Sequence, residues 1–216
     1  MIPNRRDCNV STLAKNSEFA GGAKMNELFK NKYRIPSNRL KGWDYSSAGL
    51  YFVTICTQNR KSFFGTVENS IMKLSSIGRI AFEFWQKISQ LQSHVELDEF
   101  VIMPNHLHGV LVLNEMSSSV ETLHCNVSTT DVSKQMSKIS PKKGSLGSIM
   151  RSYKSAVSKW ANDNGFEEFK WQARYYDQIV RDEKSLDTIR YYIVHNPMQW
   201  HLDKHNPLNV SEKDET

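Results

Sequence analysis

The hydrophobic residues of the chain gather in short runs, each with a period typical of one kind of element. The run LYFVTICT at 50–57 is β-branched and aromatic, and Ser-Ala-Gly and Gln-Asn-Arg flank it, so it predicts a buried strand. From Ser75 to Gln92 the apolar residues recur at helical spacing, which predicts an amphipathic helix. This helix is expected to pack on the sheet that contains the strand.

Two further strand-like runs follow, VELDEFVIM at 95–103 and HLHGVLVL at 106–113, and Pro104-Asn105 separates them. Turn residues between two such runs favour an antiparallel hairpin. Residues 114–145 are rich in Ser, Thr, Lys and Asn and show no period. This composition predicts a long flexible loop or insertion.

The last third of the chain completes the pattern. An apolar stripe in 146–161 predicts a helix with a basic outer side, and RYYDQIV at 174–180 predicts a strand. A final helix is expected from about Lys184 and ends before Pro197, because the residue before proline resists helical geometry. The order strand, helix, hairpin, helix, strand, helix favours an α+β fold with helices packed on an antiparallel sheet over a doubly wound parallel sheet.

Composition narrows the class of protein. The 216 residues are 39% hydrophobic, enough for one buried core, and basic residues exceed acidic ones by five, which favours an anionic partner such as nucleic acid. The three cysteines are far apart and form no C-x-x-C pair, so they indicate neither a disulfide framework nor a zinc knuckle and fit a reducing cytoplasm. No leader-like apolar stretch and no run of about 18 apolar residues occurs, so we expect no export and no membrane partner.

Candidate chemistry begins on the second strand of the predicted hairpin. His106 and His108 are two residues apart, so on a strand both side chains project from the same face. Neutral imidazole is the commonest protein ligand of metal ions, and this spacing lets both rings bind one ion. Taken alone, the pair is better explained as one hydrogen-bonded and one solvated histidine at the start of a strand. The aliphatic strand that follows favours a functional role for the pair, because burying polar groups at the start of such a strand costs free energy unless they are used.

A phenol and an amide on the predicted last helix complete the candidate site. Tyr192 and Asn196 are four residues apart and lie at the margin of the helix's apolar stripe, whereas Tyr191 points nearly the opposite way. The stripe consists of Leu186, Ile189 and Ile193. The carbonyl oxygen of Asn196 could be the third ligand of an ion, and Mg²⁺ or Mn²⁺ suits such a set. On this segment alone the favoured interpretation is a tyrosine in the core and an asparagine that caps the helix before Pro197.

Several other aromatic and basic residues could have either a structural or a functional role. Tyr153 lies on an apolar stripe, which favours core packing, and Tyr175 and Tyr176 alternate across a strand, so one is expected to pack and the other to meet solvent. Trp171 could stack on a base or be buried against the sheet. Seven cations flank the proposed site and are candidates for phosphate contacts, although a solvated face is the alternative for each. They are Lys142, Lys143, Arg151, Lys154, Lys159, Arg174 and Arg181.

Two segments taken together carry a family resemblance. MPNHLHGVLVL at 103–113 and KWQARYYDQIVRDEKSLDTIRYYIVHNP at 170–197 resemble the HUH single-tyrosine transposases, in particular the branch associated with repetitive extragenic palindromes (REP). Leu107 supplies the hydrophobic residue between the two histidines. The resemblance covers roughly residues 45–200 and departs from the family pattern at none of the key positions.

The resemblance implies a ferredoxin-like α+β domain, which we place at 41–205 with the flexible insertion 114–145 inside it. Residues 1–40 are then an N-terminal extension and 206–216 a C-terminal tail. The implied protein works on DNA, as a monomer or a homodimer, in the cytoplasm.

The resemblance also implies a chemistry. His106 and His108 would bind a divalent metal, Mg²⁺ or Mn²⁺, and Tyr192, followed by Ile193 and Asn196, would be the nucleophile. The implied reaction nicks single-stranded or hairpin DNA through a 5′-phosphotyrosine bond and rejoins strands without ATP. Two alternatives stay open, a domesticated hairpin-binding protein that does not cut DNA and a metal-dependent phosphoesterase that uses water.

Overall fold

The computed structural model describes residues 39–116 and 141–209. The chain divides into two units, Met1–Lys41 and Gly42–Thr216, and the second contains the fold. Most of the predicted extension 1–40, residues 117–140 of the predicted insertion and residues 210–216 of the predicted tail lie outside the described residues.

A four-stranded antiparallel sheet forms the centre of the second unit. Its strands are β4 (Val95–Met103), β5 (His106–Leu113), β1 (Gly49–Cys56) and β6 (Tyr176–Val180), in that spatial order. Strands β1 and β5 lie at the middle, and all three pairings are antiparallel. With the helices that connect these strands, the sheet confirms the predicted α+β fold with helices packed on an antiparallel sheet.

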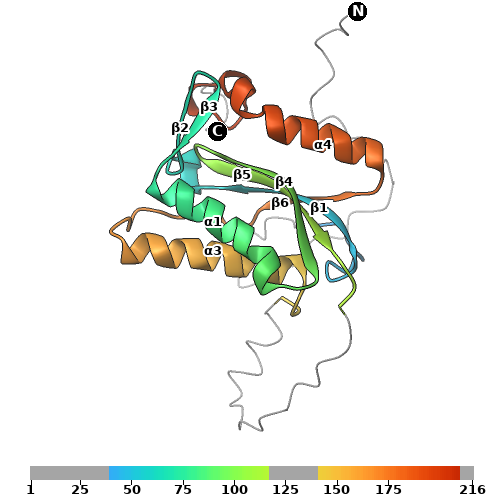
Figure 1. Cartoon of the computed structure of the whole chain (residues 1–216). Coiled ribbons are helices and arrows are strands. Elements are labelled where there is room, and N and C mark those ends of the chain that lie inside the picture. Colours follow the sequence, from blue (N-terminus) through green and yellow to red (C-terminus); the bar gives the residue numbers. More distant parts are fainter. Residues whose placement is uncertain (1–38, 117–140, 210–216) are drawn as a thin grey trace, which may run out of the picture. The chain divides into compact units, whose positions relative to one another are not determined.

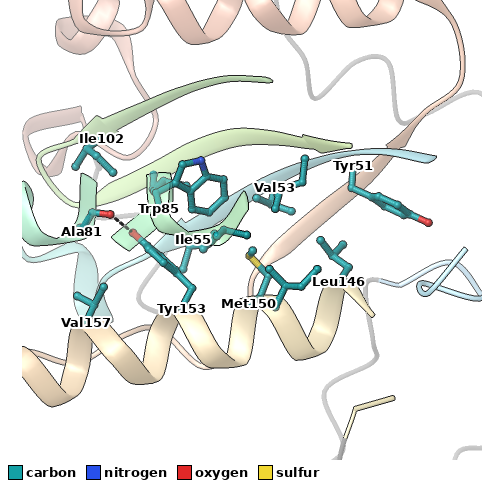
Figure 2. Close-up of a cluster of buried hydrophobic side chains, with 14 of the residues drawn as sticks. Tyr51, Val53, Ile55, Ala81, Trp85, Ile102, Leu146, Met150, Tyr153 and Val157 are labelled. Carbon is teal, nitrogen blue, oxygen red and sulfur yellow. Dashed lines mark hydrogen bonds between the residues drawn. The ribbon is translucent and has the colours of Figure 1, made fainter. Parts of the chain in front are cut away.

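Helices α1 (Ser76–Leu91) and α3 (Leu146–Asp163) cover one face of the sheet, as Figure 1 shows. A serine side chain caps each of them, because Ser75 Oγ accepts from the N–H of Gly78 and Ser145 Oγ from that of Ser148. The core between helices and sheet is the large cluster drawn in Figure 2. There Tyr153 is buried and its hydroxyl donates to the carbonyl of Ala81, so its predicted place in the core is confirmed.

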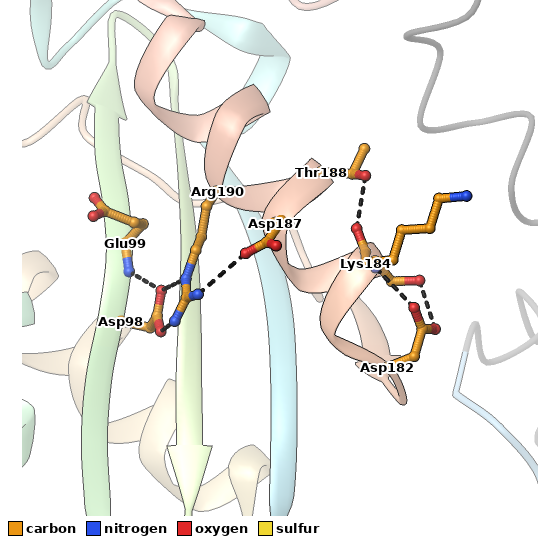
Figure 3. Close-up of polar contacts among 8 residues, drawn as sticks. Asp98, Glu99, Asp182, Lys184, Asp187, Thr188 and Arg190 are labelled. Atoms are coloured by element: carbon orange, nitrogen blue, oxygen red, sulfur yellow. Dashed lines mark hydrogen bonds and ion pairs between the residues drawn. The ribbon is translucent and has the colours of Figure 1, made fainter.

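Helix α4 (Glu183–His195) covers the opposite face (Figure 1). Its buried residues Ile189 and Ile193 belong to a second, smaller apolar cluster on that face. A salt bridge fixes the helix to β4, where Arg190 donates through Nε to Asp98 Oδ1 at 2.9 Å and through a second nitrogen to Oδ2 (Figure 3). Asp182 Oδ1 accepts from the N–H of Ser185 and so caps the first turn. The salt bridge therefore fixes the middle of α4 to the sheet, and the cap stabilises the first turn of the helix.

Other elements differ from the pattern read in the sequence. A small hairpin of β2 (Gly65–Glu68) and β3 (Ile71–Leu74) was not predicted. Strand β6 begins two residues later than expected, because Arg174 has a φ of 75° and cannot continue a strand. Within residues 39–116 and 141–209 there are also three short 3₁₀ helices, η1 (Gln58–Arg60), η2 (Pro197–Leu202) and η3 (Pro207–Asn209). In the part of the chain that the structure describes, every helix is too short or too polar to cross a bilayer.

Candidate active site

Strand alternation brings the two histidines to the face that α4 covers. Leu107 belongs to the core under α1 and α3, so its neighbours His106 and His108 point the other way. In the register with β1, Cys56 lies opposite His106 and Thr54 opposite His108. The two rings are almost fully buried, with centroids 4.5 Å apart. The predicted convergence of the pair on one point is present in the structure.

Asn105 fixes the orientation of the first histidine. Its amide nitrogen donates to the carbonyls of Arg60 (2.9 Å) and His205 (2.7 Å), which leaves its oxygen to face the ring of His106. That oxygen lies 2.9 Å from Nδ1 of His106, so Nδ1 carries the proton and donates. The other ring nitrogen, Nε2, is buried and has no hydrogen-bond partner among the described residues. A buried lone pair with nothing to accept is a sign of a missing ligand.

The second histidine connects the sheet to α4. Nδ1 of His108 lies 2.8 Å from the hydroxyl of Thr54, and Nε2 lies 3.2 Å from the phenol oxygen of Tyr192. Burial, together with the charges of Lys204 and His205, lowers the pKa of His108 well below its usual value. Burial likewise lowers the pKa of His106. Both rings are therefore neutral at physiological pH, the form that binds metal ions.

Tyr192 reaches the histidines from the last turn of α4. Its ring centroid is 5.1 Å from that of His108, and the adjacent Ile193 is buried and anchors the turn. Burial first and the Asp203 carboxylate second raise the pKa of Tyr192, a hydrogen bond from Asn196 lowers it, and the net result is a pKa of about 12. The phenol is therefore protonated at neutral pH and needs help to become a nucleophile.

Asn196 ends α4 and lies beside Tyr192. Its side chain is 2% exposed. Like Nε2 of His106, its Oδ1 is buried and has no hydrogen-bond partner in the described segments. The backbone N–H of the same residue donates to the carbonyl of Ile193, so it caps the helix as well. The two interpretations of Asn196, helix cap and candidate ligand, are therefore compatible.

A carboxylate that was not predicted from the sequence lies at this site. Ligand atoms of His106, His108 and Asp203 all lie within 4.8 Å of one another. Asp203 directly follows η2, and its Oδ1 accepts from the N–H of His205 at 2.6 Å. The ring of His205 in turn lies 4.6 Å from that of His106. The turn of η2 brings this segment back to the sheet, and the cluster of charged and imidazole groups in HLDKH was the one signal for it in the sequence.

The donor set fits a divalent cation. Two neutral imidazoles and a carboxylate converge, and the buried His106 Nε2 and Asn196 Oδ1 have unused lone pairs. Nitrogen and oxygen donors of this mixture suit Mn²⁺ and related ions and are softer than the all-oxygen sites typical of Mg²⁺. The group could hold a metal ion on the same face as the phenol of Tyr192.

The basic residues that the sequence singled out lie less close to the histidines than Tyr192 and Asp203 do. Arg151, Lys154 and Lys159 belong to α3, which covers the face of the sheet opposite to the histidines. The amine of Lys154 donates to the carbonyls of Gln172 and Arg174, and burial lowers its pKa to about 8. Lys142 and Lys159 form exposed ion pairs, with Asp44 and with Asp163. Lys143, Arg174 and Arg181 are exposed.

Two cations that the sequence did not single out act on the site directly. The charges of Arg60 and Lys204 both contribute to the lowered pKa of His106. Their positions are linked, because Nη1 of Arg60 donates to the carbonyl of Lys204 at 2.8 Å. Of the described cations, these two are therefore better placed than those of α3 to meet an anionic ligand at the histidines.

A buried His-x-His pair, joined by a carboxylate and faced by a tyrosine from a helix on the same side of an antiparallel sheet, resembles the metal group of the HUH type and could hold an ion. No protein-family model matches the chain. A protein of Haemophilus influenzae, described only as uncharacterized, is 39% identical over 171 residues, which is 78% of this chain and 91% of the relative. The chain belongs to the family of this Haemophilus protein.

Two solved structures are similar to the chain. One is described as a REP-associated tyrosine transposase bound to a REP hairpin, with 18% identity, a TM-score of 0.47, and coverage of 83% of this chain and 77% of the other. The second is a protein of Deinococcus radiodurans described provisionally as a transposase, with 15% identity, a TM-score of 0.34, and coverage of 72% of this chain and 95% of the other.

Proposed function

We propose that this protein is a metal-dependent enzyme that nicks and rejoins single-stranded DNA with Tyr192 as its nucleophile. One observation carries the proposal: the phenol oxygen of Tyr192 lies 3.2 Å from Nε2 of His108, a member of the His-His-Asp group. A tyrosine that only filled the core would not need to meet a candidate metal ligand in a buried polar site.

Each residue of the site has a role in this reaction. His106, His108 and Asp203 would hold the metal, and Asn196 offers a further oxygen next to the phenol. A bound Mg²⁺ or Mn²⁺ would polarise the scissile phosphate and neutralise charge on its oxygens. Thr54 and Asn105 set the ring orientations, so the lone pairs already point at the site before any ligand arrives.

The bond changes balance without a further reactant. The phenol oxygen of Tyr192 attacks phosphorus, a bond from tyrosine oxygen to phosphorus forms, and the bond from phosphorus to the 3′ oxygen breaks. The phenol loses one proton and the leaving 3′ oxygen gains one. Attack by that 3′ hydroxyl, or by another, reverses the exchange and releases the tyrosine. Because the phosphodiester energy is kept in the covalent bond, rejoining strands needs no ATP.

Hairpin-forming repeats are the proposed substrate. The sequence motifs resemble those of the REP-associated branch, and the net charge of +5 favours DNA. The similar transposase structure is described as bound to a REP hairpin, which is the same class of ligand. The described chain supplies His106, His108, Asp203 and Tyr192 by itself, so the proposed site needs no partner subunit.

The test is covalent trapping. Protein is mixed with hairpin oligonucleotides and Mn²⁺, and denaturing gels are searched for a protein-DNA species. Tyr192→Phe should abolish that species while binding stays intact. Tyr191→Phe is the matched control, because the neighbouring phenol is 56% exposed and takes no part in the site. Adduct formation by Tyr192→Phe would overturn the proposal.

The two alternatives predict other results. A phosphoesterase that uses water would cut the DNA with no trapped species, and Tyr192→Phe would keep that cleavage. A protein that only binds hairpins would bind the oligonucleotides and cut none of them in either Mg²⁺ or Mn²⁺.

A further inference from the structure

A thiol and a third imidazole lie beside the histidine pair and take no part in the chemistry above. Cys56 ends β1 opposite His106, and its sulfur lies 3.9 Å from Nδ1 of His205. The ring centroids of His205 and His106 are 4.6 Å apart. Cys56 and His205 are both partly exposed, so an ion can reach them from solvent. The three side chains together offer one sulfur and two nitrogen donors at this end of the sheet.

The spacing of the thiol and the imidazole is close to the spacing that zinc requires. Zinc in a tetrahedral site lies about 2.3 Å from sulfur and about 2.0–2.1 Å from nitrogen, which places the two donor atoms about 3.6 Å from each other. The 3.9 Å between Cys56 and His205 needs only a small side-chain rotation to reach that value. As a hydrogen bond between thiol and imidazole the same contact is weak. The pair therefore suits a shared ion better than a bond between its own members.

One side chain holds both imidazoles in place. The amide nitrogen of Asn105 donates to the carbonyl of His205, and the amide oxygen accepts from Nδ1 of His106. The N–H of His205 donates to Asp203, so its backbone is fixed on both sides. Nε2 of His106 is buried and has no hydrogen-bond partner among the described residues, which leaves its lone pair to an ion. The nitrogen donors are therefore oriented before any ion arrives.

The protonation states favour a metal ion over an oxidant as the partner of the thiol. The pKa of the Cys56 thiol is raised to about 11, chiefly by burial, so little thiolate is present at neutral pH. Oxidation sensors need that thiolate, whereas a coordinated ion removes the proton outright. The pKa of His205 is lowered to about 4, chiefly by burial, so its ring is neutral and can bind.

We infer that Cys56, His205 and His106 form a second metal site, which takes a thiophilic divalent ion such as Zn²⁺. Cysteine sulfur and imidazole nitrogen are common ligands of zinc, whereas Mg²⁺ and Mn²⁺ favour oxygen. When the ion binds, the thiol releases its proton to solvent and the sulfur coordinates as thiolate. The binding itself goes beyond the proposed function and does not depend on it.

The two metal sites exclude each other, because they share one atom. Nε2 of His106 has a single lone pair, so it cannot serve the thiophilic ion and the ion of the group with His108 and Asp203 at the same time. Zinc would therefore hold the protein in a form that lacks a ligand of the proposed catalytic ion. This consequence, inhibition of DNA nicking by zinc, rests on the proposed function.

The test asks whether Cys56 sulfur binds the ion. The parent is the full-length protein with Cys8→Ser and Cys125→Ser, so that Cys56 is its single thiol. Co²⁺, which takes the same ligands as Zn²⁺, is titrated in and the thiolate-to-metal charge-transfer band is recorded. Zn²⁺ affinity is measured by competition, and X-ray absorption of the zinc-bound parent gives the ligand distances. The variants are Cys56→Ser and His205→Ala, and His201→Ala removes an exposed imidazole nearby as the matched control.

We expect the parent and His201→Ala to show the charge-transfer band and one sulfur at about 2.3 Å from zinc. Cys56→Ser should lose the band. Loss of a partner that only orients a ligand weakens metal binding by about 10- to 100-fold, so loss of the thiolate itself should weaken Zn²⁺ binding by about 100-fold or more. Mn²⁺ affinity should change far less, because manganese does not favour sulfur. His205→Ala should weaken Zn²⁺ binding as well.

A parent without the band, or zinc surrounded by nitrogen and oxygen alone, overturns the inference. Equal Zn²⁺ affinity in the parent and Cys56→Ser does the same. Adduct formation in Mn²⁺, measured against rising Zn²⁺ and relative to each protein's own yield without zinc, tests the consequence separately. Zinc also binds nitrogen and oxygen groups more tightly than manganese does, so Cys56→Ser should still be inhibited, but only at higher Zn²⁺ concentrations. If no protein forms an adduct, the proposed function fails and the spectra still decide the zinc site.

Discussion

Asn105 offers the sharpest test of how the site is built. The change Asn105→Ala removes an entirely buried amide that makes two hydrogen bonds to carbonyls and accepts one from His106. At a net value of about 1 kcal/mol each, their loss should lower the free energy of unfolding by about 3 kcal/mol. Without its acceptor the ring of His106 is free to turn or change tautomer. Loss of such a partner weakens metal binding by about 10- to 100-fold.

The assay pairs urea unfolding with Mn²⁺ titration by calorimetry, at a temperature where circular dichroism shows the variant to be folded. Asn105→Asp separates the two effects, because a carboxylate still accepts from His106 but cannot donate to the two carbonyls. It should therefore be destabilised and yet keep more Mn²⁺ affinity than Asn105→Ala. Asn114→Ala is the matched control, since that amide is exposed and bonds to Glu96 just beyond the other end of β5. Wild-type Mn²⁺ affinity in a destabilised Asn105→Ala would refute the reasoning.

Three further predictions concern packing, charge and ligand. Gly109→Ala would place a Cβ 2.5 Å from the Trp85 ring, so urea unfolding should show a loss of about 1–3 kcal/mol, and an unchanged midpoint would contradict this packing. Hydrogen bonds from Arg190 lower the pKa of Asp98. The difference in the free energy of unfolding between wild type and Asp98→Asn should therefore be largest above the unfolded pKa of about 3.9 and shrink as the pH falls below it. A difference that does not change between pH 2 and pH 6 would argue against the Asp98–Arg190 pair. Mn²⁺ should raise the melting temperature of the wild type, and Asp203→Ala should lose most of that rise; an equal rise in both would exclude Asp203 as a ligand.

The regular part of the site could be predicted from the sequence. Period-two alternation was enough to place His106 and His108 on one face of a strand, and helical spacing was enough to place Tyr192 at the margin of a buried stripe. Both arguments need only the geometry of a single element. That the two meet at 3.2 Å depends on the packing of α4 on the sheet, which the family resemblance implied and periodicity did not.

The irregular part could not be predicted in this way. Asp203 and His205 follow a 3₁₀ turn, where residue spacing says nothing about direction in space. The short β2–β3 hairpin was missed although Asn69 and Ser70 form a two-residue turn with positive φ, because its strands have only four residues each. The cations of α3 looked close to the site in the sequence, yet the sheet lies between that helix and the histidines.

Identifying the residue that becomes joined to DNA would test directly whether Tyr192 is the nucleophile. Trapped protein-DNA species would be digested with protease and nuclease, and the modified peptide read by mass spectrometry. The proposed reaction should leave a 5′-phosphonucleotide on Tyr192 and on none of Tyr153, Tyr175, Tyr176 or Tyr191. Attachment to any of those four, or cleaved DNA with an unmodified Tyr192, would contradict it.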